Sequence, residues 1–304
     1  MTSDQTDLSQ GAHRFDVFDV HQHVGTTVDA HAVNIAESVS AEIDAQTMDE
    51  VRTRLRIMDE AGTTQALVSP GHSYDRTDGA AATRRQNDQI AAYRDQTPDR
   101  FPIAAGIVEP TERESGLTEI SRMSDELGLV GVSLHVIYQG VTMDSQWVLR
   151  YLERMGELGM VPLVHAPDDT LSESLWRLGK VARSMPDLTF LALEPFYTYE
   201  GMLQTFFIAD VAPNIVFETA SCTDFDLLES FVREFGAHRV LYGSQFYSVI
   251  HPPSVNRYSD RRTTLLREEI AASSLTESEK AAILGGNARS LFGRWLDGPT
   301  RSGQ

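Results

Sequence analysis

The chain has 304 residues, of which 41% are hydrophobic, and its formal charge at pH 7 is −18. This length and hydrophobic content allow a large buried core, which excludes a disordered protein. The negative charge disfavours nucleic acid and anionic membranes as partners, and the single cysteine, Cys222, excludes a disulfide framework or a multi-cysteine metal site.

The N-terminal residues do not resemble a secretory signal, and no apolar run is long enough to span a membrane. We therefore expect a soluble, cytoplasmic protein that acts on a small molecule. Residues 14–297 are predicted to form a single domain between a disordered tail at 1–13 and a second tail at 298–304. The protein could form a homo-oligomer, but no segment of the sequence indicates an interface.

Eight short, mostly apolar runs recur along the chain, and each is bounded by turn signals. They lie at 16–20, 65–69, 102–108, 130–134, 161–165, 188–193, 214–218 and 239–243. Continuous rather than alternating hydrophobicity is typical of strands that are buried on both faces of a parallel sheet.

Helical segments are expected between these runs. The first has a capping box at Thr47 and Glu50 and stops at Gly62. Others are predicted near 79–96, 111–127, 146–158, 171–185, 200–211 and 225–235, with a helical tail from 261 to 296. Eight strand–helix units predict a closed (β/α)8 TIM barrel, since no strand is followed by the G-x-G-x-x-G turn of an open doubly wound sheet.

The active site of such a barrel lies at the carboxyl ends of its strands. The polar residues found there are His21, His23, His72, Glu109, His135, His165, Glu194, Glu218 and Gln245. Alternation puts His21 and His23 on one side of the first strand, and His165 could join them from across the barrel. Three imidazoles that leave a position open for water are typical of a catalytic site for a divalent metal.

The run Asp19-Val-His21-Gln-His23 resembles the D-x-H-x-H strand of the amidohydrolase superfamily. More specifically, the chain is similar to the amidohydrolase-related (amidohydrolase 2) family of metal-dependent hydrolases, lactonases and decarboxylases of the aminocarboxymuconate-semialdehyde type. The resemblance spans residues 16–296 and is carried by the segments QNDQIAAYRDQTPDRFPIAAGIVEP, LGLVGVSLH, LGMVPLVHA, HRVLYGS and GGNARSLFG.

The resemblance also exposes two departures. After the sixth strand the family usually has a histidine, where this chain has Glu194, and after the eighth it has an aspartate, where this chain has Gln245. An amide has no protonation equilibrium near neutral pH, so Gln245 cannot be the base. In one interpretation, Glu194 replaces the carboxylate of the aspartate that the family has after the eighth strand. In the other, the site no longer performs metal-dependent hydrolysis, and the protein is a metal-free enzyme, catalyses a different reaction or only binds a ligand.

Several other residues have two interpretations. His135 could donate to a developing oxyanion or be structural, whereas His72, Glu109 and Glu218 are expected to support other groups, and Asp19 to orient the first strand or a metal ligand. Arg76 could pair with a substrate carboxylate. The aromatic residues of EPFYTYE and SQFYSV either pack over the barrel mouth or line a pocket for a flat substrate. They are Phe196, Tyr197, Tyr199, Phe246 and Tyr247.

We predict one divalent metal, preferably zinc with manganese or iron as alternatives, held by His21, His23, His165 and Glu194. Glu194, Gln245 and His135 occupy the predicted catalytic positions. The predicted reaction is attack of metal-activated water on an ester, lactone or amide carbonyl of a small substrate. The alternatives are a non-oxidative decarboxylase of the aminocarboxymuconate-semialdehyde type, and a metal-free barrel that binds a small molecule or runs a different reaction.

Overall fold

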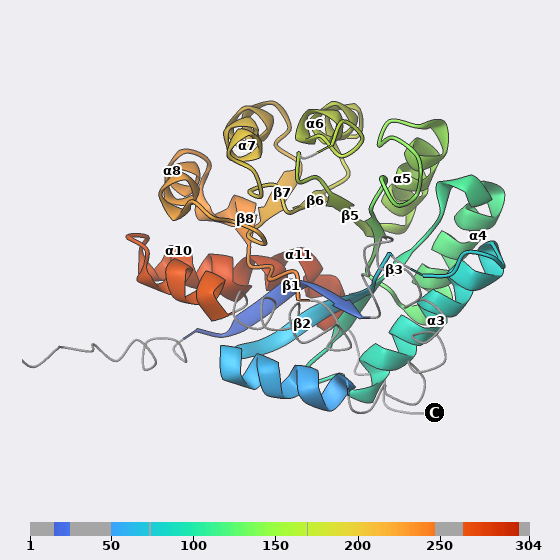
Figure 1. The fold of residues 1–304 in the computed structure, drawn as a ribbon, viewed down its shortest axis with the longest axis horizontal. Helices are drawn as coiled ribbons and strands as arrows, with labels where there is room; N and C mark the ends of the chain where they lie inside the picture. Colours follow the sequence, from blue (N-terminus) through green and yellow to red (C-terminus); the bar gives the residue numbers. More distant parts are fainter. Residues whose placement is uncertain (1–14, 25–49, 73, 169, 247–263, 298–304) are drawn as a thin grey trace, which may run out of the picture.

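A computed structural model describes residues 15–24, 50–72, 74–168, 170–246 and 264–297. Eight parallel strands follow one another in chain order around a barrel (Figure 1). They are β1 (Val17–Val24), β2 (Thr63–Pro70), β3 (Ile103–Ile107), β4 (Gly131–Leu134), β5 (Val161–His165), β6 (Phe190–Leu193), β7 (Ile215–Glu218) and β8 (Val240–Leu241). The predicted (β/α)8 barrel is confirmed.

The barrel is closed by contacts between β1 and the segment that contains β8. The backbone N–H of Val20 donates to the carbonyl of Tyr242 at 3.0 Å, and that of His23 donates to Phe246 at 2.7 Å. These bonds continue the parallel pairing, because Gln22 and Phe246 form a parallel bridge. The two ends of the sheet therefore meet directly beside the histidine pair of β1.

Helices surround the strands (Figure 1). In chain order they are 50–61, α3 (Ala80–Gln96), α4 (Glu114–Arg122), α5 (Gln146–Leu158), α6 (Leu175–Ser184), α7 (Tyr199–Val211), α8 (Phe225–Phe235), 264–272, α10 (Glu277–Ala281) and α11 (Asn287–Leu296). Short 3-10 turns lie at Pro110–Glu112 and Ala237–Arg239, and π-helical turns at Met123–Leu127 and Ala282–Gly286. No helix in the described part of the chain is both long and apolar enough to cross a membrane.

Two helix predictions differ from the structure. The helix expected at 171–185 begins only at Leu175, so Glu173 belongs to the loop after β5. The predicted tail helix is interrupted before Thr276, whose side chain forms a capping box with Glu279 and starts α10. The predicted capping residue Thr47 and the two predicted tails lie outside the described residues.

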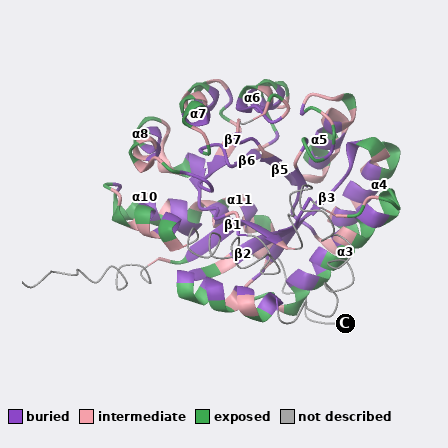
Figure 2. Cartoon of the chain, viewed as in Figure 1, coloured by how far each residue is buried: buried purple, intermediate pink, exposed green. Residues whose placement is uncertain are grey.

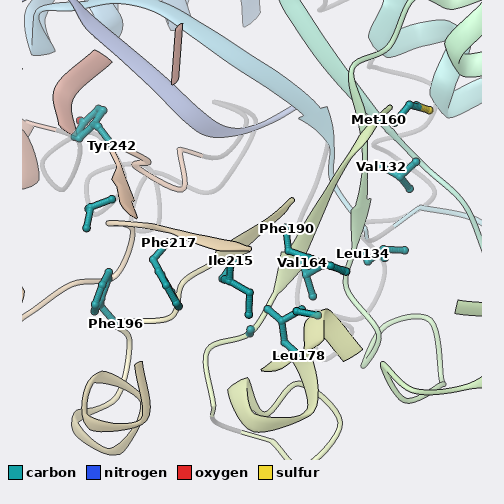
Figure 3. Packing of buried hydrophobic residues seen from close by; sticks show 14 of the residues in the cluster. Val132, Leu134, Met160, Val164, Leu178, Phe190, Phe196, Ile215, Phe217 and Tyr242 are labelled. Atoms are coloured by element: carbon teal, nitrogen blue, oxygen red, sulfur yellow. The ribbon is translucent and has the colours of Figure 1, made fainter. Parts of the chain in front are cut away.

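The hydrophobic core has two layers, and Figure 2 shows that the strands and parts of the surrounding helices are buried. The larger one lies between the strands and the surrounding helices, and part of it is drawn in Figure 3, where Val164, Phe190 and Phe217 point away from the barrel axis. The smaller layer fills the barrel with side chains such as Leu163 and Leu191, and Phe292 of α11 packs against it. Phe292 is thus fully buried together with the side chains inside the barrel.

A β-bulge in β1 decides which way its histidines point. Phe18 and Val20 face the barrel interior, so simple alternation would turn the odd-numbered residues outward. The register with β2 slips by one residue between Asp19 and Gln22. After this bulge the odd-numbered His21 and His23 face the mouth, which is the effect that bulges have beside active sites.

Candidate active site

Five imidazole rings form an arc around the barrel mouth, at the ends of β1, β2, β4 and β5. In order they belong to His21, His23, His72, His135 and His165. The centroids of neighbouring rings are 4.8, 6.3, 5.3 and 3.6 Å apart. Glu194 contacts His165 and Glu218 contacts His21, so two carboxylates complete the circle on the side of β6 and β7.

His21 and His23 direct one nitrogen each at a common point. Their Nε2 atoms are 2.9 Å apart. Nδ1 of His21 lies 3.3 Å from the Glu218 carboxylate, and Nδ1 of His23 lies 3.2 Å from the carbonyl oxygen of Pro70. Both neighbours are acceptors, so each Nδ1 carries the proton and each Nε2 presents a lone pair. Two lone pairs that face each other repel unless a cation lies between them.

The protonation of His23 suits a metal ligand. Burial, together with the nearby His21 and His135, holds the pKa of His23 well below its usual value of 6.5. Metal binding requires neutral imidazoles, and metal-bound histidines typically donate their second N–H to a carboxylate or a backbone carbonyl. The residues present therefore fit a divalent cation at the two Nε2 atoms.

A buried network holds this part of β1 in place. Arg54, which is fully buried, donates to the backbone carbonyl of His23 at 2.7 Å and to the side-chain oxygen of Gln22 at 3.0 Å. Gln22 in turn donates to Asp19, whose carboxylate also accepts from the hydroxyl and backbone N–H of Ser244. Asp19 thus orients the strand, as the sequence predicts, and ties it to the segment after β8.

Glu173 is the centre of a second group on the opposite side of the arc. One carboxylate oxygen lies 2.7 Å from Nδ1 of His135 and the other 3.0 Å from Nδ1 of His165. The two rings are stacked, with an interplanar angle of 25°. Nδ1 is therefore protonated in both rings, and Glu173 fixes their tautomers together.

The two stacked rings differ in charge. Burial and the charge of His165 lower the pKa of His135 to about 4. Burial also opposes a charge on His165, but Glu194 and Glu173 flank its two ring nitrogens and raise its pKa to about 10. The same contacts overcome burial at both carboxylates and lower the pKa values of Glu173 and Glu194 to about 2. His165 therefore lies between two carboxylates that favour its protonated form.

Three residues after β6, β7 and β8 adopt a left-handed backbone conformation without being glycine. Their φ angles are 58° at Glu194, 63° at Ser221 and 55° at Gln245. Such strain persists where the surroundings impose it, and it often marks functional sites. The hydroxyl of Ser221 lies 3.0 Å from both Glu194 Oε1 and Gln245 Oε1. Its single proton can serve only one acceptor, and the ionised Glu194 is the stronger one.

Glu218 connects the two sides of the mouth. It contacts Nδ1 of His21 and accepts hydrogen bonds from the backbone N–H groups of Glu194 and Ala220. The carboxylate has room only because residue 243 is glycine, where a Cβ atom would lie 2.1 Å from Glu218 Oε2. Glu218 therefore has the supporting role that the sequence predicts.

The structure divides the four predicted metal ligands into two pairs. His21 contacts His23, and His165 contacts Glu194. Among the described residues, the one group of three ligand types whose atoms all lie within 4.8 Å of one another is His135, His165 and Glu173. As metal ligands, all four residues remain predictions.

Other residues near the mouth already have partners. Arg76 pairs with Glu109 at 3.0 Å and donates to the carbonyl of His72, which explains why Glu109 is buried. His72 is buried too, with Nε2 at 2.9 Å from Ser133 Oγ and no hydrogen-bond partner for Nδ1 among the described residues. Burial holds the pKa of His72 well below 6.5.

The aromatic residues predicted near the mouth separate into different environments. Phe196 packs against Phe217 and Phe231 in the core outside the barrel, and Phe246 lies against the guanidinium of Arg54 (Figure 3 shows Phe196). Tyr197 and Tyr199 are exposed. Tyr247 lies outside the described residues.

Sequence reasoning missed Glu173 and Ser221. Glu173 falls inside a helix that the pattern predicts at 171–185, where a glutamate would be an ordinary surface residue. One signal in the sequence could have indicated it: acidic residues, beginning with Asp168, follow the fifth strand. Ser221 follows β7 by three residues, and only its backbone conformation and its contacts distinguish it from a loop serine.

A family model described as an amidohydrolase matches residues 18–294 of the chain. A search of curated proteins finds no significant match. The family match covers the whole barrel, from β1 to α11.

Solved structures with the same fold include three enzymes. A 2,6-dihydroxybenzoate decarboxylase from Rhizobium has a TM-score of 0.67 and 18% identity, covering 93% of this chain and 100% of that one. A dihydroxybenzoic acid decarboxylase from Polaromonas sp. JS666, with bound manganese and the inhibitor 2-nitroresorcinol, has a TM-score of 0.65 and 16% identity, with 92% and 97% covered. A 4-oxalomesaconate hydratase from Rhodopseudomonas palustris has a TM-score of 0.66 and 19% identity, with 92% and 96% covered.

Proposed function

This chain belongs to the amidohydrolase family, and from that premise we propose that it is a metal-dependent, non-oxidative decarboxylase of a small aromatic carboxylic acid. This reaction is the alternative that the sequence left open, and it replaces hydrolysis as our first choice. Two of the similar structures are decarboxylases of hydroxylated benzoic acids. The observation that carries the proposal is the position of His165, whose two ring nitrogens each contact a carboxylate.

Decarboxylation and hydrolysis place opposite demands on the titratable groups. In decarboxylation the bond between the ring carbon and the carboxylate breaks, carbon dioxide leaves, and the carbon takes up a proton. Hydrolysis instead needs a base near neutral pH that takes a proton from water. His165 holds a proton with a pKa of about 10, while Glu194, with a pKa of about 2, is a weak base. His165 and Glu194 together are therefore better suited to donate a proton to a substrate than to accept one from water.

We assign the metal to His21 and His23 and the proton to His165. A divalent cation at the two Nε2 atoms would polarise an oxygen of the substrate and help to bind its carboxylate. Nε2 of His165, hydrogen-bonded to Glu194, is the atom from which the proton leaves. Glu173 holds the ring in place at Nδ1, and the neutral imidazole regains its proton from water after the step.

Two features of the charge distribution favour a bound divalent cation over a purely structural role for His21 and His23. The cation would balance part of the negative charge of Glu194 and Glu218, which are both buried. It would also remove the repulsion between the two histidine lone pairs. Manganese, zinc and iron all accept imidazole ligands, and elemental analysis of the purified protein identifies which of them is bound.

The test is a carbon dioxide assay on the purified protein with a panel of hydroxylated benzoic acids, in the presence of Mn²⁺ or Zn²⁺. We expect carbon dioxide release that disappears with a chelator and in His21→Ala. Metal content is measured in the same samples, with His238→Ala as a control at the protein surface. Metal-dependent cleavage of esters or lactones without carbon dioxide release would reverse our choice in favour of hydrolysis.

Hydrolysis remains the second candidate because of the position of Glu194. Its carboxylate is buried, and although burial alone would raise its pKa, the neighbouring His165 lowers that pKa to about 2. A carboxylate so close to the histidine pair could accept a proton from a bound water. Glu194→Gln distinguishes the two reactions, because it removes the base of hydrolysis but leaves a hydrogen-bond partner for His165.

A further inference from the structure

Ser221 and Gln245 form a chain of polar contacts with Glu194 at the ends of three neighbouring strands. The hydroxyl oxygen of Ser221 lies 3.0 Å from Glu194 Oε1 and 3.0 Å from Gln245 Oε1. The other oxygen of Glu194, Oε2, contacts Nε2 of His165. The chain therefore runs from the segment after β8, through the segments after β7 and β6, to the ring at the end of β5.

The backbone of these three residues is strained. Five non-glycine residues in the described part of the chain have a positive φ angle, and Glu194, Ser221 and Gln245 are three of the five. Ser221 and Glu194 are also buried, with 1% and 5% of their surface exposed. Strained residues persist where their surroundings impose the conformation, and they cluster at functional sites. The strain concentrated in these three residues indicates that their side chains are held in place for a function at the mouth.

A count of protons shows that the contact between Ser221 and Gln245 needs a donor at position 245. Ser221 has one hydroxyl proton, and Glu194 receives it because an ionised oxygen is the stronger acceptor. The Ser221 oxygen can then only accept, so an amide oxygen 3.0 Å away would face it without a proton between them. The oxygen and the NH₂ group of an amide have nearly the same shape. With the amide turned over, Gln245 donates to Ser221, and both contacts of Ser221 contain a proton.

We propose that Gln245 and Ser221 are positioning residues for the proton-donating side of the mouth. The amide NH₂ of Gln245 donates to the hydroxyl oxygen of Ser221, and Ser221 donates to Oε1 of Glu194. Because Oε1 is held in this way, the carboxylate does not rotate, and Oε2 stays on His165. The role of His165 rests on the proposed function, whereas the directions of the two hydrogen bonds do not depend on the reaction.

The same geometry explains why a carboxylate does not suit position 245. Glutamate has nearly the shape of glutamine, but when ionised it only accepts hydrogen bonds. In Gln245→Glu, two carboxylates would compete for the single proton of Ser221. Their negative charges would also lie near each other at a largely buried site, where charges are weakly screened. The Glu194 carboxylate would then lose the contact that keeps it on His165.

The first test compares melting temperatures of the metal-free protein at pH 8, where a glutamate introduced at position 245 is ionised. Gln245→Glu should lower the melting temperature by roughly 2–6 °C. Gln245→Met keeps the length of the side chain without a polar group, and it should have a smaller effect because Ser221 still donates to Glu194. Gln146→Glu is the matched control, because Gln146 is exposed on α5, and it should melt close to the wild type.

The order of the two variants at position 245 decides the direction of the hydrogen bond. If Gln245 presents its oxygen to Ser221, a carboxylate oxygen can take the same place, and Gln245→Glu should be tolerated better than Gln245→Met. A melting temperature of Gln245→Glu equal to or above that of Gln245→Met therefore overturns the proposal.

The second test observes the hydrogen bonds by NMR. The side-chain NH₂ group of Gln245 gives a pair of proton–nitrogen resonances, which are assigned by their absence in Gln245→Met. Ser221→Ala removes the acceptor of this group, so the pair should shift, and the ring nitrogens of His165 should shift with it. Ser184→Ala removes a hydroxyl at the end of α6 and should change neither. Gln245 resonances that stay unchanged in Ser221→Ala overturn the proposal.

Turnover connects these hydrogen bonds with the reaction. Ser221→Ala and Gln245→Glu should each lower kcat by roughly 10-fold or more with little change in KM, because both residues act through His165 and not on the bound substrate. Turnover that is unchanged in Ser221→Ala would show that the positioning role is wrong. If the wild type releases no carbon dioxide but the melting temperatures and resonances behave as expected, the hydrogen-bond directions hold and the proposed function fails.

Discussion

The two sides of the barrel mouth contain the same residue types in opposite arrangements. On the β1 side, His21 and His23 face a carboxylate and a carbonyl with Nδ1, and their two Nε2 atoms converge. On the β5 side, His165 has a carboxylate at each of its ring nitrogens. The first arrangement leaves lone pairs for a cation, whereas the second keeps a proton on the ring.

This difference shows that the number of histidines alone does not identify the function of such a site. An imidazole can serve as a ligand when its second nitrogen donates to an acceptor and its first is open. It becomes an acid when both nitrogens lie against negative charge, because the charge raises its pKa. Glu194, which follows β6, places a carboxylate at Nε2 of His165.

The largest effect is expected for His165→Asn, which tests whether the β5 side of the mouth supplies the proton. If His165 supplies the proton, turnover should fall by roughly 10²- to 10⁴-fold, the usual contribution of general acid catalysis, while metal content stays unchanged. Turnover and metal are measured on the same preparation. Loss of metal together with activity would show instead that His165 belongs to the metal site, as the sequence first predicts.

The β1 side is tested by Glu218→Gln. The amide removes the negative charge that holds Nδ1 of His21 protonated, so metal affinity should weaken by about 10- to 100-fold, and turnover at saturating metal should change less. Isothermal titration of the metal-free protein measures the affinity. Ser69→Ala is a suitable control, since Ser69 is a second neighbour of His23 Nδ1 and Pro70 remains as acceptor. Equal losses in both variants would contradict the assigned role of Glu218.

Glu173→Gln examines how the two stacked rings are fixed. A glutamine offers one oxygen acceptor and one NH₂ donor, so His135 and His165 can no longer both donate from Nδ1. Nitrogen NMR should show one of them changing to the tautomer protonated at Nε2, and turnover should fall by roughly 10-fold or more. Asp168→Asn in the same loop should change neither. Unchanged tautomers would mean that the stacking, rather than Glu173, fixes the rings.

The smallest expected effect is a dependence of stability on alkaline pH. The pKa of His165 is raised to about 10 by Glu194 and Glu173, against 6.5 in the unfolded chain. The protonated ring therefore stabilises the fold fully below pH 6.5, and this stabilisation is lost as the pH rises through about 10. Urea unfolding of the metal-free protein at several pH values measures it. His165→Asn should remove this part of the slope, and an unchanged slope would place the stabilisation elsewhere.

Much of the fold was predictable because it depends on short-range patterns. Each of the eight apolar runs is a strand, and the run at 161–165 has the predicted bounds. Helix limits were less accurate where local signals compete. The loop that contains Glu173 has helical character in sequence, but its carboxylate is drawn to two imidazoles that lie 38 and 8 residues away in the chain.

The sequence by itself determined the barrel, the position of its mouth and the identity of most polar residues there, because hydrophobic periodicity and strand-end placement are local properties. Tertiary structure decided what those residues do. A bulge in β1 turned His21 and His23 inward, and neighbours from distant strands fixed which nitrogen of each ring carries a proton. Charge and tautomer depend on atoms within a few ångströms in space, and the sequence does not reveal these until the chain is folded.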